Sequence, residues 1–366
     1  MAHFNGEFLA FWGCSMDSIT LVLAGAFAIG LAFGVVALLS GFCLTSGLRN
    51  WSQNNDGRGV RTFALAAAVS VIGAQLLAVF GLVDLGKSIY LQPSFSAPLI
   101  AFGGLIFGYG MVLANACASR ALVLLGRGNL RSLVVIIIIA IVSQMTLKGL
   151  IAPARIAFLN WTATAPHSIS LPALLSASGV GASPAHLLAA FIFGGALIAF
   201  AFTHAPFRRA YGQAAAGIAI GAMVVAGWFV TGNLGNDDFN PVTVTSISFI
   251  APIADTVQYV MLSTGSTLSF GIALVAGVLV GSFGTALATG SFALEGYNSP
   301  RHMLRSIAGA ALMGAGGAMA YGCTIGQGLT GLSTLGLPSM IGVAGILLGA
   351  TAALRGPIRV PALQTA

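Results

Sequence analysis

Three of the four cysteines stand at interruptions of an apolar chain that are rich in small and polar residues. Cys43 lies in SGFCLTSG (40–47), Cys117 in NACASRAL (115–122) and Cys323 in YGCTIGQG (321–328). None belongs to a CxxC pair, so the spacing favours neither a dithiol redox couple nor a zinc site. A neutral thiol is a weak hydrogen-bond donor and its sulfur a soft acceptor, which suits transient contacts. Cys14, in FWGCSMD, has no such setting, and we interpret it as a structural thiol.

A helix that starts just after such an interruption would point its unpaired N–H groups at the break. This arrangement binds an anion without a buried Lys or Arg. Arg120 fits two roles, attraction of an anion or anchoring of the chain at a membrane surface. The neighbouring side chains that could donate further hydrogen bonds are Thr45, Ser46, Ser119, Thr324 and Gln327. We expect no metal, no cofactor and no catalytic group.

The composition defines the elements that must position these residues. The chain has 366 residues, of which 57% are hydrophobic and 6% charged, whereas soluble domains carry about 25% charged residues. Apolar runs of about 20 residues recur along it, which predicts an all-α polytopic membrane protein. The 49 glycines favour close helix contacts and broken helices. The nine expected spans are 18–40, 62–83, 98–115, 132–152, 185–205, 212–232, 268–289, 304–322 and 339–354.

Segment 242–263 is apolar but contains Pro252 and Asp255, so we expect an interfacial or partly inserted helix there. The basic residues set the orientation, because cytoplasmic loops are enriched in Lys and Arg. Most of them follow odd-numbered spans, and only Lys87, Lys148 and Arg155 fall on the other side. This predicts an N-terminus outside and a C-terminus in the cytoplasm. It also accounts for the net charge of +7 without a nucleic-acid partner.

An internal repeat is also predicted. Phe33-Gly34 precede Phe42-Cys43 as Phe283-Gly284 precede Phe292-Ala293, and paired glycines precede Cys117 and Cys323 at equal distances. Residues 1–155 would form the first half, with spans 1–4 and the breaks at Cys43 and Cys117. Residues 156–183 would be a hinge, and 184–267 would hold the middle spans and the interfacial segment. Residues 268–366 would form the second half with the break at Cys323, and short re-entrant helices would follow the breaks.

The stretches 33–50, 116–135 and 321–333 resemble the signature segments of the YeeE/YedE family of bacterial inner-membrane sulfur-compound transporters. The resemblance implies an hourglass-shaped protein with a central constriction. It also implies uptake of thiosulfate, or a related sulfur anion, past protonated thiols at Cys43, Cys117 and Cys323. A TusA-like cytoplasmic sulfur carrier would be a partner, beside the lipid bilayer. Gln327 departs from the family pattern, which often has His there.

Two other functions fit the same residues. A membrane oxidoreductase would cycle its thiols with a quinone, although the lack of CxxC disfavours it. A channel for another small solute, such as a selenium compound, would leave the cysteines as packing residues. For an imported anion, no chain of buried Asp or His is apparent in the spans. This favours facilitated passage, drawn by cytoplasmic consumption, over co-transport with a cation.

Overall fold

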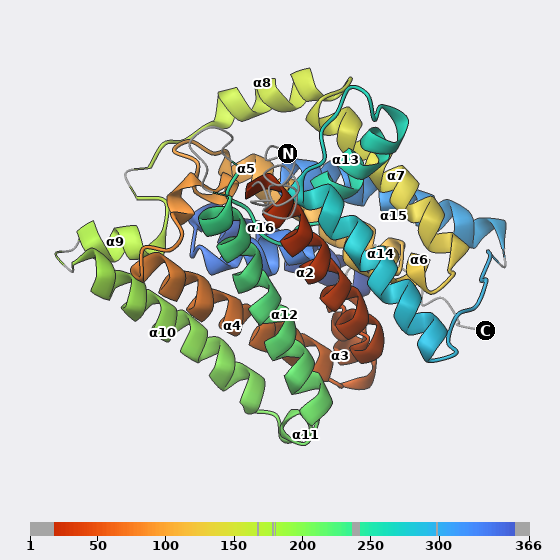
Figure 1. Ribbon diagram of the computed structural model, residues 1–366, viewed down its shortest axis with the longest axis horizontal. Helices are drawn as coiled ribbons and strands as arrows, with labels where there is room; N and C mark the ends of the chain where they lie inside the picture. Colours follow the sequence, from red (N-terminus) through yellow and green to blue (C-terminus); the bar gives the residue numbers. More distant parts are fainter. Residues whose placement is uncertain are drawn as a thin grey trace, which may run out of the picture.

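The computed structural model describes residues 18–166, 168–177, 179, 181–235, 242–297 and 299–355, and over these ranges the protein is built from helices (Figure 1). The described elements are α2 (Ser18–Ser40), α3 (Leu44–Asn54), α4 (Arg58–Val79), η1 (Leu85–Lys87), η2 (Ile89–Leu91), α5 (Ala97–Leu113), α6 (Ala118–Gly126), α7 (Leu130–Leu147), α8 (Ala152–Thr162), α9 (Leu171–Ala177), α10 (Ala182–Phe202), α11 (Ala205–Arg208), α12 (Tyr211–Phe229), the π-helix η3 (Val230–Leu234), α13 (Ile250–Met261), α14 (Phe270–Ala288), α15 (Pro300–Met319), the π-helix η4 (Gly326–Gly331) and α16 (Leu337–Arg355). The prediction of an all-α polytopic membrane protein is confirmed.

Eight segments of the described chain are long and apolar enough to cross a membrane, against the nine spans expected. The span expected at 304–322 falls on α15, which has the length but not the apolar composition. Its first turns carry Arg301, His302 and Arg305. α15 packs between α5 and α7, and its small residues are buried there. A helix enclosed by other helices needs less apolar surface than one that faces lipid.

Glycines bring helices from distant parts of the chain into backbone contact. α2 lies along α14 (Figure 1), and a Cβ on Gly277 or Gly281 would overlap carbonyl oxygens of α2. α5 lies along α16 in the same way, and a Cβ on Gly108 or Gly349 would overlap a carbonyl of the facing helix. Each of these helices carries its contact glycines four residues apart, which is the spacing of close helix pairs in membranes.

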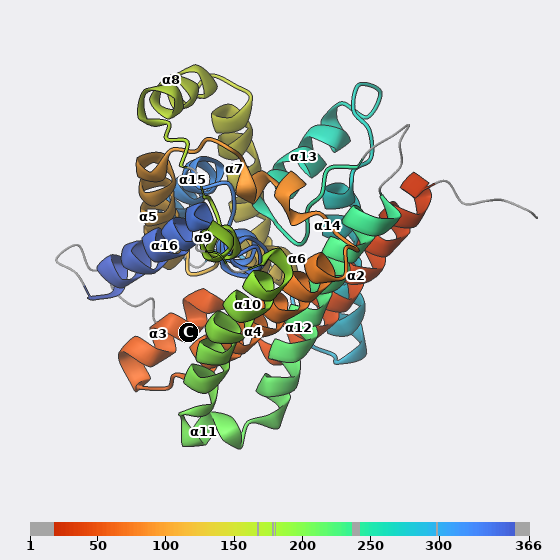
Figure 2. The ribbon, with the colours of Figure 1, turned by 90° about the vertical axis from the view of Figure 1, so that its left-hand side faces the viewer.

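The charged residues divide between the two ends of the bundle. In Figure 2, α3 and α11 lie at one end, and α8 and α13 lie at the other. At the first end, Arg355 Nε donates to Ser52 Oγ at 2.9 Å, which joins α16 to α3. At the other, Lys148 Nζ lies 3.2 Å from Asp255 Oδ1, which joins α7 to α13. We call the end with α3 and α11 the basic end; its location in the cytoplasm stays a prediction.

Several expected segments take a more specific form in the structure. The segment expected to be interfacial is extended before Phe249 and then forms α13, whose Asp255 also accepts a hydrogen bond from Gln144. The expected hinge, 156–183, contains most of α8 and all of α9. After α14, residues 291–297 run beside the α6–α7 junction, where Leu130 N donates to the Glu295 carbonyl at 2.9 Å. Cys14 lies outside the described residues, and the internal repeat and its boundaries stay predictions.

Replacing Gly281 by leucine should destabilise the fold, because the added side chain would overlap the Leu31 carbonyl of α2. Overpacking of this kind costs about 1–3 kcal/mol, so the melting temperature in detergent should fall by several degrees. Gly284→Leu on the same helix is the control, since a Cβ there meets no atom of the described residues within 4 Å. Equal melting temperatures for the two variants would contradict the close α2–α14 contact.

Candidate functional site

The three cysteine breaks share one backbone conformation. A residue with positive φ stands two positions before each cysteine: Gly41 at 65°, Asn115 at 60° and Tyr321 at 56°. A left-handed residue ends a helix because it turns the next carbonyl away from the helix axis. Glycine takes this conformation without strain and asparagine tolerates it, whereas a tyrosine there is unusual. The breaks after α2, α5 and α15 are therefore built into the local sequence.

Each cysteine then begins the next helical segment. The carbonyls of Cys43, Cys117 and Cys323 accept hydrogen bonds from the amides four residues later, at 3.0, 2.9 and 2.8 Å. The cysteines are thus the N-cap residues of α3, of α6 and of the helical segment that runs into η4. All three side chains are buried, with 6%, 1% and 0% of their surface exposed. Each thiol therefore stands at the positive end of a helix, as expected for a site that attracts anions.

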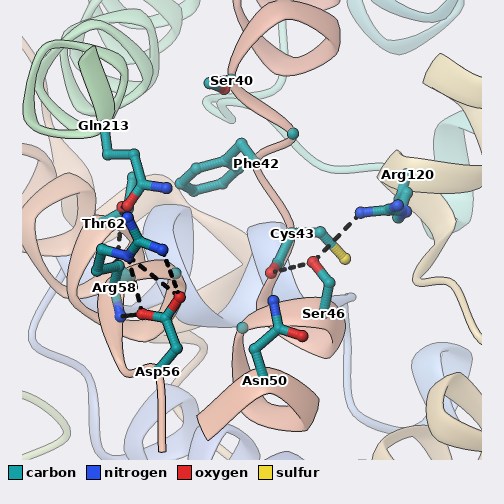
Figure 3. A pocket seen from close by; sticks show the side chains of 13 residues that line it. Ser40, Phe42, Cys43, Ser46, Asn50, Asp56, Arg58, Thr62, Arg120 and Gln213 are labelled. Carbon is teal, nitrogen blue, oxygen red and sulfur yellow. Dashed lines mark hydrogen bonds and ion pairs between the residues drawn. The ribbon is translucent and has the colours of Figure 1, made fainter. Parts of the chain in front are cut away.

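Two of the three thiols face one another. Cys43 Sγ lies 3.8 Å from Cys117 Sγ, and Cys117 Sγ lies 3.2 Å from Ser119 Oγ. Arg120 donates to Ser46 Oγ at 3.2 Å, and Ser46 Oγ donates to the Cys43 carbonyl, also at 3.2 Å (Figure 3). The polar side chains beside the first two breaks therefore form one connected group around the thiol pair.

This group borders a cavity of about 290 Å³ that we call the basic cavity. Cys43, Ser46 and Arg120 line it, and Asp56 and Arg58 lie on its far wall (Figure 3). Arg58 Nη2 lies 2.8 Å from Asp56 Oδ2, and this contact holds the pKa of the Asp56 carboxyl below its usual range. Asp56 is therefore ionised and paired at neutral pH.

Cys323 belongs to a second arrangement. Gly326 N donates to Cys323 Sγ at 3.3 Å, so the sulfur is already an acceptor and its S–H is left to donate to another atom. The Gln327 amide nitrogen donates to the Ala320 carbonyl, across the break. Thr330 Oγ1 donates to the Ile247 carbonyl at 2.6 Å, which ties η4 to the segment before α13.

A second cavity, of about 300 Å³, reaches this region, and we call it the tyrosine cavity. Its lining includes Tyr90, Tyr321 and Gln327. The basic cavity includes Arg58 and Thr62 from the start of α4, whereas Tyr90 belongs to η2, beyond the end of α4. The two cavities therefore approach the cysteines from opposite ends of α4.

Aromatic rings pack between the first break and η4. The Phe63 ring stacks on Phe42 with centroids 5.7 Å apart, and its far edge packs beside Gly328 of η4. Cys43, Cys117 and Cys323 belong to the same buried core. The hourglass outline that the family resemblance implies stays a prediction.

The structure therefore divides the sequence-predicted residues into two groups. Cys43, Ser46, Cys117, Ser119 and Arg120 meet at the basic cavity, and Cys323, Thr324 and Gln327 lie together at the third break. Thr45 is buried, and its hydroxyl has no hydrogen-bond partner among the described residues.

Sequence reasoning missed several polar residues at the breaks. Arg49 donates to Asn115 Oδ1 and, at 3.3 Å, to the Val112 carbonyl, so it holds the end of α5 in place. The sequence marked Arg49 only as a basic residue that sets orientation. Asn115, next to the small residues before Cys117, was the available signal for a left-handed helix end. Tyr90 of η2 and Ser339 of α16 gave no signal, since neither lies in a sequence motif.

No group of three or more His, Cys, Asp or Glu side chains that could hold a metal ion occurs in the described part of the chain. The arrangement offers instead thiols, hydroxyls and helix N-termini between two cavities. These groups can make weak, reversible contacts with an anion.

Comparison with known proteins agrees with this chemistry. The chain is 26% identical over 345 residues to the thiosulfate transporter TsuA of Escherichia coli K12, which covers 90% of this chain and 93% of that protein. It is 25% identical over 334 residues to TsuA of Spirochaeta thermophila, which covers 88% and 94%. The family described as Sulphur transport matches residues 39–352. The chain, a multi-pass membrane protein with these apolar helices, therefore belongs to the Sulphur transport (YeeE/YedE) family.

Proposed function

We propose that the protein carries thiosulfate across the bacterial inner membrane into the cytoplasm, past protonated thiols at Cys43, Cys117 and Cys323. Membership of the Sulphur transport family and the two relatives named thiosulfate transporters support a sulfur anion as the substrate. The observation that carries the proposal is the pair of buried thiols, Cys43 and Cys117, 3.8 Å apart beside a cavity that Arg120 lines.

The thiols act best in their neutral form. A thiolate would repel a dianion, whereas an S–H group donates a weak hydrogen bond to sulfur or oxygen. Helix N-termini at all three cysteines supply partial positive charge without a fixed counter-ion. Because each contact is weak, the anion can leave one thiol for the next.

The proposed path begins in the tyrosine cavity and ends in the basic cavity. The anion would meet Cys323 first and then the Cys43–Cys117 pair, where the layer of Phe42 and Phe63 must open. Arg120 would attract it into the basic cavity. A TusA-like sulfur carrier, the partner that the family resemblance implies, would receive it at the basic end.

Import of a dianion must overcome the membrane potential. Two charges that move into an interior 100 mV negative require about 4.6 kcal/mol, equal to about 2,000-fold in concentration. Either rapid consumption inside the cell or a co-transported cation must supply this free energy.

One observation favours a second candidate, a membrane thiol oxidoreductase. At 3.8 Å, the sulfurs of Cys43 and Cys117 are close enough to form a disulfide after a small shift. This function requires the disulfide to form in each turnover, whereas the transport proposal requires both thiols to stay reduced.

Growth on thiosulfate as the sole sulfur source tests the transport proposal. In a bacterial strain without sulfate and thiosulfate uptake, the wild-type chain should restore growth. Alanine variants of Cys43, Cys117 and Cys323 should each slow uptake at least about tenfold, since each loses a contact on the path. Cys14→Ala is the matched control and should grow as wild type. Normal growth of all three cysteine variants would contradict transport past the thiols, although thiosulfate would still be the substrate.

A cross-linking experiment separates the two candidates. Oxidation with copper phenanthroline should join Cys43 to Cys117 and stop thiosulfate uptake, and dithiothreitol should restore it. Cys43→Ser should resist the oxidant while keeping residual uptake. If the disulfide instead accumulates during turnover without added oxidant, with two electrons and two protons passing to a membrane quinone, the oxidoreductase is correct.

The charge of Arg120 should affect substrate capture at the basic cavity. Arg120→Gln should raise the half-saturating thiosulfate concentration about fivefold for flux from that side, and more weakly at high salt. Arg120→Lys keeps the charge and is the control. Equal half-saturating thiosulfate concentrations for Arg120→Gln and Arg120→Lys would mean that Arg120 only positions Ser46.

A further inference from the structure

The region around the tyrosine cavity contains buried oxygen atoms that lack hydrogen bonds. Among the described residues, these include Tyr90 OH, Thr324 Oγ1, Gln327 Oε1 and Ser339 Oγ. The four side chains are at most 2% exposed, and Tyr90 and Gln327 line the cavity itself. The Ser248 side chain lies beside the Tyr90 hydroxyl. Since buried polar atoms are nearly always paired, such a cluster indicates a bound ligand.

Three of these side chains converge on one side of η4. The point that a Cβ on Gly331 would occupy lies 2.5 Å from Ser339 Oγ and 2.8 Å from Gln327 Oε1. The Tyr90 ring lies 2.9 Å from the same point, and its hydroxyl lies 3.4 Å from the matching point on Gly326. The ring therefore lies along one turn of the π-helix, with Ser339 Oγ and Gln327 Oε1 near its Cδ1 atom and its hydroxyl toward Gly326. Single-turn π-helices often occur at functional sites.

Gln327 decides which charge this group of oxygens can bind. Its amide nitrogen donates to the Ala320 carbonyl, so the unpaired atom is the amide oxygen, which can only accept. The hydroxyls of Tyr90 and Ser339 can turn their oxygens toward a ligand in the same way. None of the described residues that line the cavity is charged. An anion would face the partial negative charge of the amide oxygen, whereas a cation would be coordinated by it.

The C-terminal end of α15 adds partial negative charge beside the oxygen of Gln327. α15 ends at Met319, so its C-terminal carbonyls carry partial negative charge beside Ala320 and Gln327. Only four residues later, the helical segment that begins at Cys323 presents N–H groups. In transporters with broken helices, exposed carbonyls and helix C-termini coordinate sodium, while N-termini face the anionic substrate.

We infer that Gln327, Ser339 and Tyr90 form a binding site for a sodium ion that moves together with the anion. The inference rests on the proposed transport function and deepens it. One sodium ion bound next to Cys323 cancels half the charge of thiosulfate, and two cancel all of it. Neutral oxygens need no acidic residue, so the scarcity of Asp and His in the spans does not oppose cation coupling.

The test uses the full chain, purified and reconstituted in phosphatidylethanolamine–phosphatidylglycerol vesicles. Thiosulfate uptake and the melting temperature are measured in NaCl, KCl and choline chloride at equal pH and ionic strength. Sodium alone should raise both. Ser339→Ala and Tyr90→Phe should raise the half-saturating sodium concentration about tenfold, the usual effect of disturbing a metal site.

Ser70→Ala is the matched control, because Ser70 is an equally buried serine whose hydroxyl already donates to the Ala66 carbonyl at 2.8 Å. It should leave the sodium dependence unchanged. If Ser339→Ala does not fold, Ser339→Thr, which keeps the hydroxyl, and Tyr90→Phe carry the test. The melting temperature of Cys323→Ala should still rise with sodium, since the thiol is not part of the site.

Equal uptake and equal melting temperatures in the three salts would overturn the sodium site. Uptake that follows a proton gradient and ignores sodium would also overturn it. If sodium raises the melting temperature of wild type but not of Ser339→Ala, while no salt supports thiosulfate uptake, the cation site stands and the proposed transport function fails.

Discussion

The structure depends on one constraint: broken backbone buried among membrane helices must find its hydrogen bonds inside the protein. Two of the three cysteine breaks satisfy it through a nearby side chain. Arg49 binds the carbonyl end of α5, and the Gln327 amide binds the carbonyl at the end of α15. The cysteine carbonyls start the next helical segments. Close glycine contacts between α2 and α14, and between α5 and α16, enclose these breaks in protein.

Because other helices enclose the breaks, helix ends can lie close to one another there without facing lipid. The first two breaks bring two helix N-termini and two thiols together beside Arg120. The third break has the same order of helix end and helix start, but none of the described residues that line the tyrosine cavity beside it is charged. The two cavities therefore differ in the charge of the side chains that line them. The basic cavity suits an anion alone, and the tyrosine cavity suits an anion accompanied by a positive charge.

Much of the fold followed from local sequence. Apolar length located the membrane helices, and small and polar residues around each cysteine located the three breaks. A left-handed residue or a helix start is decided by neighbouring residues, so local sequence is enough to predict it. Contacts between distant segments could not be predicted from the local sequence. Nothing local pairs Cys43 with Cys117, 74 residues later, or brings Tyr90 of η2 and Ser339 of α16 to the same side of η4. The span expected at 304–322, on α15, stays a prediction, because the charged first turns of this helix lower its mean hydropathy.

The pairing of α2 with α14 has a consequence for synthesis of the chain. Gly30 of α2 packs against α14 near Leu274, about 240 residues later in the sequence. At ribosomal rates of about 5–20 residues per second, α2 waits about 10–50 seconds for its partner. During that interval, the polar break at Cys43 has no completed enclosure. The nascent protein must therefore hold its first helices at the insertion machinery, and assembly of the core is the last event of its biogenesis.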